Sequence, residues 1–177
     1  MRKFEVVSKY KDISLPKRAT RYSAGYDIES ACDITIPSML TPSLIKYINK
    51  YYDPIFDDES RLLEMQEYVK SEIKPTLVST GIKVKMPEDE CLLLYNRSSN
   101  PLKRGLILAN GVGVIDSDYY NNPDNEGEIF GQFINLSPTP YKIHKGDRIM
   151  QGIFKKYLVT EDDESSVSRS GGFGSTD

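Results

Sequence analysis

Short segments in which apolar and polar residues alternate dominate the chain. Alternation with a period of two is clear in residues 32–36 and 82–86, as expected for half-buried strands. Further apolar runs, bounded by Gly, Pro, Asn or Asp, occupy residues 91–95, 106–108, 129–136 and 149–154. Turn-forming sequences separate the runs at 87–90, 122–125 and 145–147. This spacing predicts an all-β sandwich or closed barrel rather than β-α-β units.

Residues 41–73 have a helical period instead. Thr41 followed by Pro42 suits the start of a helix, and apolar side chains then recur on one face. A second apolar stripe begins after the acidic residues 57–59, which are favourable at a helix N-terminus. The segment predicts a helical hairpin inserted into the β domain. It serves either as a cluster packed over the barrel or as the site of a regulatory protein partner.

The composition changes again near residue 160. Residues 161–166 are acidic and hydrophilic, and residues 169–176 combine an Arg, a Phe, three Gly and the two adjacent hydroxyl side chains of Ser175 and Thr176. No Lys precedes Ser175, which excludes a Walker A loop. We predict one β domain at 1–160, with its insertion, and a flexible arm at 161–177 that folds over a nucleotide.

Composition narrows the chemistry. The 177 residues include 23 Lys and Arg against 26 Asp and Glu, a net charge of −3, so we expect no nucleic acid or membrane partner. One His and two distant Cys exclude His-rich zinc sites and disulfide frameworks. No apolar run approaches the ~20 residues of a membrane span, and no signal peptide is recognisable, so we expect a cytoplasmic protein. Catalysis then depends on carboxylates, arginines, hydroxyls and backbone amides.

Two short clusters could carry such chemistry. Residues 110–116 (NGVGVID) have the first two glycines of a dinucleotide fingerprint, but its third glycine is replaced by Asp116 and a strand follows, so that interpretation fails. We predict instead a tight hairpin whose backbone approaches a flat ligand. Residues 96–101 offer an Arg fork, two hydroxyls and free amides, which suit a phosphate. Ordinary turns remain the alternative for both clusters.

In order along the chain, these clusters resemble the five motifs of the homotrimeric dUTPase family. The matching segments are 24–28 (AGYDI), 97–99 (RSS), 110–119 continuing to 127–128, 146–151 (GDRIMQ) and 169–176. The resemblance covers the chain from about residue 19 to its end. It implies a β-jelly-roll (a distorted barrel) and a homotrimer with shared active sites. It also implies Mg²⁺-dependent hydrolysis of dUTP to dUMP and pyrophosphate, which removes dUTP and supplies dUMP for dTMP synthesis.

The resemblance also implies a role for each matching residue. Asp116 is the general base for the water that attacks the α-phosphorus, Arg169 acts as an arginine finger, and Asp27 holds Mg²⁺ through water. Tyr119 packs against C2′ of the sugar and leaves no room for a ribose hydroxyl. The implied substrate-binding residues are Arg97, Ser98, Ser99, Asn110, Gly113, Val114, Ile115, Tyr119, Phe130, Gln151, Phe173, Gly174, Ser175 and Thr176.

The sequence departs from the family pattern at Asn96, at residues 121–126, in the spacing from Arg169 to Phe173, and at Asp177. We interpret Asp147 and Arg148 as a structural turn pair, and Asp27 could instead satisfy neighbouring backbone amides. Two alternatives to the dUTPase function stay open. One is the dCTP deaminase branch of the same fold. The other is a regulatory protein, switched by dUTP, that binds a repressor through residues 41–73.

Overall fold

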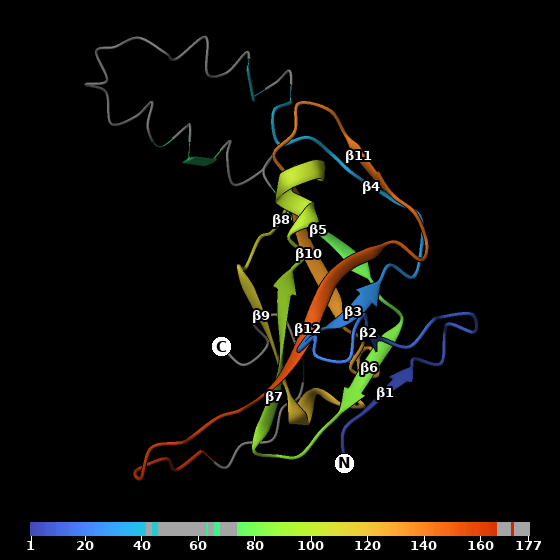
Figure 1. Ribbon diagram of the computed structural model, residues 1–177. Coiled ribbons are helices and arrows are strands. Elements are labelled where there is room, and N and C mark those ends of the chain that lie inside the picture. Colours follow the sequence, from blue (N-terminus) through green and yellow to red (C-terminus); the bar gives the residue numbers. More distant parts are fainter. Residues whose placement is uncertain (42–43, 46–62, 64–65, 68–73, 166–170, 172–177) are drawn as a thin grey trace.

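The computed structural model describes residues 1–41, 44–45, 63, 66–67, 74–165 and 171. Within these residues almost all of the regular secondary structure consists of short strands, which confirms the predicted all-β class (Figure 1). The strands are β1 (Lys3–Val6), β2 (Lys17–Arg18), β3 (Tyr26–Glu29), β4 (Ile34–Ile36), β5 (Thr76–Ser79), β6 (Ile82–Lys85), β7 (Glu90–Asn96), β8 (Leu106–Leu108), β9 (Val112–Asp116), β10 (Phe130–Asn135), β11 (Tyr141–Ile143) and β12 (Arg148–Lys156). Two short helical turns, η1 (Asn100–Arg104) and η2 (Ser117–Tyr119), follow β7 and β9.

Four antiparallel sheets form the domain. The largest has the order β2-β3-β12-β7-β9, a second has the order β5-β10-β8, and two pairs are β1-β6 and β11-β4. The long strand β12 runs through the middle of the molecule between β3 and β7 (Figure 1). Segments far apart in the sequence therefore lie side by side in one sheet.

Alternating burial explains why these segments form strands. Side chains of β10 alternate between half-buried and buried positions along its whole length, as a strand over a core requires. The buried positions of the several sheets meet in a single apolar cluster that includes Ile28, Leu92, Phe133 and Met150. The core therefore holds the two larger sheets in a fixed relation, and this relation positions the site.

An irregularity interrupts the pairing of β12 with β3. Arg148 pairs with Glu29 and Met150 pairs with Ile28, which leaves Ile149 as an extra residue on β12. Ile149 and Met150 are both fully buried, although neighbouring residues of a regular strand face opposite ways. The bulge therefore brings Arg148 to the outer face of the sheet, where Glu29 lies.

The predicted helical insertion lies mostly outside the described residues. Its start is confirmed: the hydroxyl of Thr41 accepts a hydrogen bond from the amide of Leu44 at 3.0 Å, as at a helix N-cap. Leu44, Ile45, Leu63 and residues 66–67 are helical. Neither the partner predicted for residues 41–73 nor the rest of the hairpin is tested. Residues 161–165 are exposed, as predicted for a solvated linker, and no helix among the described residues is long and apolar enough to cross a membrane.

Candidate active site

The glycine-containing segment after β8 opens a pocket instead of closing a hairpin. We predicted a tight hairpin at 110–116, but the strands on its two sides do not pair with each other. β8 pairs with β10, whereas β9 pairs with β7 in the other large sheet. Gly111, with a φ of 68°, turns the chain from one sheet into the other. The hairpin prediction is therefore wrong in detail, because the two strands separate and leave space between β9 and β10.

This space is a cavity of about 210 Å³. Its lining consists of Leu94, Asn110, Gly113, Val114, Ile115, Asp116, Tyr119, Glu128, Phe130 and Gln132. Seven of these were predicted from the sequence, so the structure brings together the expected base and sugar contacts with the expected general base. The volume is below the ~300–1,000 Å³ of pockets that hold drug-sized ligands, and it suits one flat ring rather than a whole nucleotide.

Three residues of the lining were not predicted: Leu94, Glu128 and Gln132. A sequence signal existed for two of them. Gln132 lies two residues after Phe130 on β10 and shares its face of the strand. Glu128 directly follows Gly127 within the third motif. Leu94 enters the pocket because β7 pairs with β9, a contact between strands that sequence alone does not provide.

Gly113 sets how closely side chains approach the pocket. A Cβ at this position would lie 3.2 Å from Cβ of Leu94 and 3.3 Å from Nδ2 of Asn110. Both neighbours line the same pocket. A larger residue would push one of them toward the ligand, so glycine at this position keeps the walls at their distance.

Asp116 ends β9, immediately before the turn η2 that carries Tyr119. Across the sheet it pairs with Cys91, a buried side chain. Burial raises the pKa of the Cys91 thiol, and the charge of Asp116 raises it further. The thiol therefore stays neutral and provides no competing nucleophile beside the carboxylate.

A second cluster lies at the other end of the large sheet, around Asp27. Nε of Arg97 lies 3.1 Å from Oδ1 of Asp27, and Nη1 of Arg148 lies 3.2 Å from Oδ2. Both carboxylate oxygens thus contact arginines, and the alternative role of Asp27, capping backbone amides, does not describe these contacts. Gln151 pairs with Asp27 across the sheet. With two cations for one carboxylate, the cluster is suited to an anion.

Arg148 follows Asp147, with which it is predicted to form a structural turn pair. Asp147 has the predicted turn role, since its carboxylate accepts the amide of His144 at 2.9 Å. The side chain of Arg148 instead reaches Asp27, because the bulge in β12 turns it onto the outer face. Arg148 and Asp27 also line a second cavity with Lys17 and Arg18, which adds positive charge.

The turn after β7 carries Arg97, Ser98 and Ser99. Ser98 is exposed and Ser99 half-buried, and Ser99 precedes the first residue of η1. Asn96, where the family pattern has Gly, donates to the carbonyl of Leu106 at 3.0 Å and accepts from Asn100 at 2.6 Å. The departure from the pattern is therefore part of a hydrogen-bond network that fixes the start of this turn.

The pocket and the Asp27 cluster lie on one sheet but far apart. Asp27, Gln151, Tyr95 and Val112 pair in one row across β3, β12, β7 and β9, and Asp116 lies four residues beyond Val112. Strand spacing of about 4.8 Å and a rise of about 3.3 Å per residue place Asp27 and Asp116 roughly 20 Å apart. Within one chain, these two carboxylates cannot serve the same phosphate.

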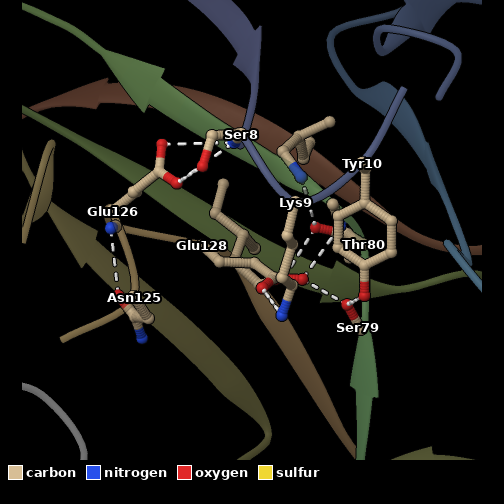
Figure 2. Close-up of polar contacts among 12 residues, drawn as sticks. Ser8, Lys9, Tyr10, Ser79, Thr80, Asn125, Glu126 and Glu128 are labelled. Carbon is tan, nitrogen blue, oxygen red and sulfur yellow. Dashed lines mark hydrogen bonds and ion pairs between the residues drawn. The ribbon is translucent and has the colours of Figure 1, made fainter. Parts of the chain in front are cut away.

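Glu128, which lines the pocket, belongs to a polar cluster that also includes Lys9 and Ser79 (Figure 2). Glu128 accepts hydrogen bonds from the hydroxyl of Ser79 and from the amide of Gly81, the latter at 3.1 Å. Its Oε2 atom lies 2.6 Å from Nζ of Lys9, a contact of opposite charges that lacks hydrogen-bond alignment. Lys9 also lies 5.8 Å from the ring centre of Phe130. The segment after β1 therefore supports the pocket wall, a long-range contact that the sequence analysis did not find.

Asp27 is the residue predicted to hold Mg²⁺, so its surroundings show whether an ion could bind there. The described residues contain no group of three or more His, Cys, Asp and Glu side chains that could enclose an ion. Mg²⁺ commonly keeps several waters and takes one or two carboxylates together with substrate phosphates. A single carboxylate at Asp27 fits that pattern. The predicted roles of Arg169, Phe173, Gly174, Ser175 and Thr176 fall on residues outside those that the structure describes.

Comparisons with known proteins agree with this geometry. The family model described as dUTPase matches residues 62–177. A protein of Lactococcus lactis subsp. lactis named deoxyuridine 5′-triphosphate nucleotidohydrolase is 44% identical over 180 residues, covering 99% of this chain and 97% of the relative. A protein of Finegoldia magna with the same name is 37% identical over 145 residues, covering 75% of this chain and 97% of the relative.

Solved structures agree as well. The crystal structure of dUTPase from Streptococcus mutans matches with a TM-score of 0.68 and 36% identity, over 89% of this chain and 98% of that one. A dUTPase from phage phi11 of S. aureus matches with a TM-score of 0.61 over 99% of both chains, and at 16% identity it supports the fold alone. The predicted jelly-roll-like β fold is thereby confirmed. By sequence, by fold and by the arrangement of its motifs, the chain belongs to the dUTPase family.

Proposed function

We propose that the protein hydrolyses dUTP to dUMP and pyrophosphate with Mg²⁺, in the cytoplasm. The reaction removes dUTP from the nucleotide pool and supplies dUMP for dTMP synthesis. The observation that carries the proposal is the pocket that holds Asn110, Tyr119, Phe130 and Asp116 together. The relatives named as nucleotidohydrolases of deoxyuridine triphosphate favour hydrolysis over the deamination of dCTP.

Selection of uracil follows from the polar groups of the pocket. The pairing edge of uracil presents an acceptor, a donor and an acceptor, which the side-chain amide of Asn110 and backbone groups of β9 can complement. Cytosine would leave those groups mispaired, at a cost of roughly 10⁴-fold in rate. Thymine adds one methyl, worth ~1–3 kcal/mol unless the walls are rigid, and the narrow space around Gly113, between Leu94 and Asn110, favours rejection of that methyl.

Asp116 performs the chemical step. Its carboxylate orients a water and takes its proton as the water oxygen bonds to the α-phosphorus. The bond from that phosphorus to the bridging oxygen breaks, and pyrophosphate leaves with the electron pair. The contribution of Asp116 is mainly positioning, because the water gives up its proton only as the new bond to phosphorus forms.

The Asp27 cluster binds the phosphates. Arg97 and Arg148 contact Asp27, and their donors can exchange the carboxylate for phosphate oxygens. Gln151 pairs with Asp27 across the sheet, and its side-chain amide donates to the carbonyl of Asn96 at 3.3 Å, next to the phosphate-binding turn. Asp27 would hold the waters of Mg²⁺, and the ion, when bound, neutralises charge on the triphosphate. The exposed hydroxyl of Ser98 is a further donor. Arg169 and the arm at 161–177 complete this site in the proposal.

We further propose a homotrimer whose sites are shared between subunits. The separation of roughly 20 Å between Asp27 and Asp116 supports an arrangement in which the phosphate cluster of one chain meets the pocket of another. The outer face of the large sheet offers the contact surface. Between the two carboxylates it carries five apolar side chains that are half-buried or exposed in the single chain: Leu93, Tyr95, Val112, Val114 and Ile153. Val114 is 56% exposed, which is unfavourable unless a neighbour covers it.

The test is hydrolysis of each deoxynucleoside triphosphate, and of UTP, with Mg²⁺, scored by product. We expect pyrophosphate from dUTP and little turnover of dCTP, dTTP or UTP. Ammonia from dCTP would overturn the proposal in favour of the deaminase. Turnover of all substrates at similar rates would contradict the selection assigned to the pocket.

A further inference from the structure

Resting on the proposed function, we infer that Asn125 is a positioning residue that holds the phenol of Tyr119 in place and thereby sharpens the choice of deoxyribose over ribose. Asn125 belongs to the segment 121–126 that lengthens the third motif. It does not line the pocket and acts only through Tyr119.

The geometry of the Asn125 amide is unambiguous. Its Nδ2 donates to the hydroxyl of Tyr119 at 2.7 Å, and its Oδ1 accepts the amide of Gly127 at 2.9 Å. Because Oδ1 accepts from a backbone N–H, the NH₂ group must face the phenol. Tyr119 is only 7% exposed, and its ring forms part of the pocket wall. The lengthened segment therefore fixes the far end of a ring whose near side faces the ligand.

The backbone of the segment is closed on itself around Tyr119. The carbonyl of Tyr119 accepts the amide of Asn122 at 3.1 Å, and the amide of Glu126 donates to the carbonyl of Asn122 at 2.7 Å. Gly127 has a φ of 78°, and a Cβ there would lie 2.3 Å from the carbonyl oxygen of Tyr119. The chain thus passes close behind Tyr119, which a side chain at 127 would prevent.

The segment is also fastened to other strands. Figure 2 shows Glu126 beside Ser8, whose amide lies 3.1 Å from Oε1 of Glu126. Nζ of Lys83 lies 2.7 Å from Oδ1 of Asn121 and 3.2 Å from Oε2 of Glu126. With both ends of the segment held, movement of Asn125 requires several contacts to break together. A support of this kind suits a ring that must reject one additional hydroxyl.

A double-mutant cycle tests the inference in the full-length protein. The specificity ratio, kcat/KM for dUTP divided by kcat/KM for UTP, is measured for the wild type, Asn125→Ala, Tyr119→Phe and the double variant. We expect Asn125→Ala to lower the ratio about three- to tenfold, the range of one hydrogen bond. In the Tyr119→Phe background the same change should have no further effect, because the hydroxyl is already absent.

Two further variants separate positioning from mere loop stability. Asn122→Ala removes the bond from Asn122 to the amide of Asp124 in the same segment, without touching the Tyr119 hydroxyl. It should leave the specificity ratio unchanged, even if the melting temperature falls. Asn125→Asp keeps an acceptor for Gly127 and lets the phenol donate instead, so it should retain most of the ratio. Both substrates are triphosphates, and the added charge cancels in the ratio.

Three results would each overturn the inference: an unchanged ratio in Asn125→Ala, an equal effect of Asn125→Ala in the wild-type and Tyr119→Phe backgrounds, or a fall in Asn122→Ala as large as in Asn125→Ala. The two proposals fail in different ways. A wild-type protein that releases no pyrophosphate from dUTP removes the proposed function. A wild type that hydrolyses dUTP selectively, with variants that stay equally selective, removes only the role of Asn125.

Discussion

The pocket and the Asp27 cluster are shaped by different physical means, and we propose that each recognises a different part of the substrate. The pocket is shaped by packing: a Cβ at its glycine would press on Leu94 and Asn110, and its tyrosine accepts a hydrogen bond from the side-chain amide of Asn125. The Asp27 cluster is shaped by charge, with arginines paired to one carboxylate at a partly exposed sheet end. A packed pocket discriminates between similar rings, whereas a charged cluster binds any polyphosphate. Selectivity and phosphate affinity should therefore be separable by mutation.

The ion pairs of the Asp27 cluster are suited to exchange. The Arg148 side chain is 52% exposed, and partly exposed pairs of this kind contribute about 0–1 kcal/mol. Breaking them to bind phosphate costs little. Deforming the pocket costs more free energy. Its residue Leu94 packs in the same core as Phe133, so a shift of Leu94 also displaces its core neighbours.

The largest effect is expected at the reacting centre. Asp116→Asn should lower kcat for dUTP by about 10²- to 10⁴-fold and leave KM nearly unchanged, because the amide cannot accept the proton of water. Steady-state kinetics provides the measurement. A variant with wild-type kcat would remove Asp116 from the role of general base.

The next effect concerns phosphate binding alone. Arg148→Ala should weaken competitive inhibition by pyrophosphate about tenfold, as expected for one charge-assisted contact, and raise KM for dUTP similarly. The preference for dUTP over dTTP should not change. Lys142→Gln is a matched control, since it removes one exposed positive charge near Asp33, away from the cluster. Equal losses in both variants would mean that general charge, not the cluster, binds pyrophosphate.

A substitution in the pocket should change turnover of dUTP and leave pyrophosphate binding unchanged. Gly113→Ala should lower kcat/KM for dUTP about fivefold, because the new methyl displaces Leu94 or Asn110 by a few tenths of an ångström. Inhibition by pyrophosphate should stay at the wild-type value. A variant that loses pyrophosphate binding but keeps its kcat/KM for dUTP would contradict the division between the two regions.

The smallest effect is expected on stability: the contribution of Glu126 to the melting temperature should depend on pH. Hydrogen bonding from Ser8, followed by that from Lys83, lowers the pKa of Glu126 below its usual 4.5. A depressed pKa in the folded state stabilises the protein above pH 4.5, and this contribution disappears as the pH falls through the folded-state pKa. Glu126→Gln should therefore lower the melting temperature slightly at pH 7 and progressively less below pH 4.5.

Glu88→Gln is the control for that experiment, because the Glu88 side chain is exposed. It should change the melting temperature less than Glu126→Gln at pH 7. A difference between Glu126→Gln and the wild type that grows toward acid pH would show that the contacts with Ser8 and Lys83 do not stabilise the fold.

Sequence patterns predicted the strands well because burial alternates regularly along them, as in β10. They also predicted most of the pocket, since its residues from 110 to 119 are close together in the chain. A sequence pattern indicates the structure of one continuous segment.

The contacts that were not predicted from the sequence arise from a β-bulge or from pairing between strands that are distant in the chain. Arg148 reaches Asp27 only because a bulge reverses its face, and a period of two places it on the other side. Leu94 enters the pocket through the pairing of β7 with β9, and Lys9 meets Glu128 across more than one hundred residues. Neither the separation of β8 from β9 nor these contacts leaves a local signal.

The sharing of sites between subunits is the claim on which the account depends, and subunit mixing tests it most directly. Asp116→Asn subunits and Arg97→Ala/Arg148→Ala subunits are combined in equal amounts under conditions that exchange chains. If pocket and cluster come from different chains, up to about a quarter of the sites regain both wild-type parts, and activity rises well above that of either variant. Activity that stays at the level of the separate variants, with exchange confirmed by mass, would contradict the account.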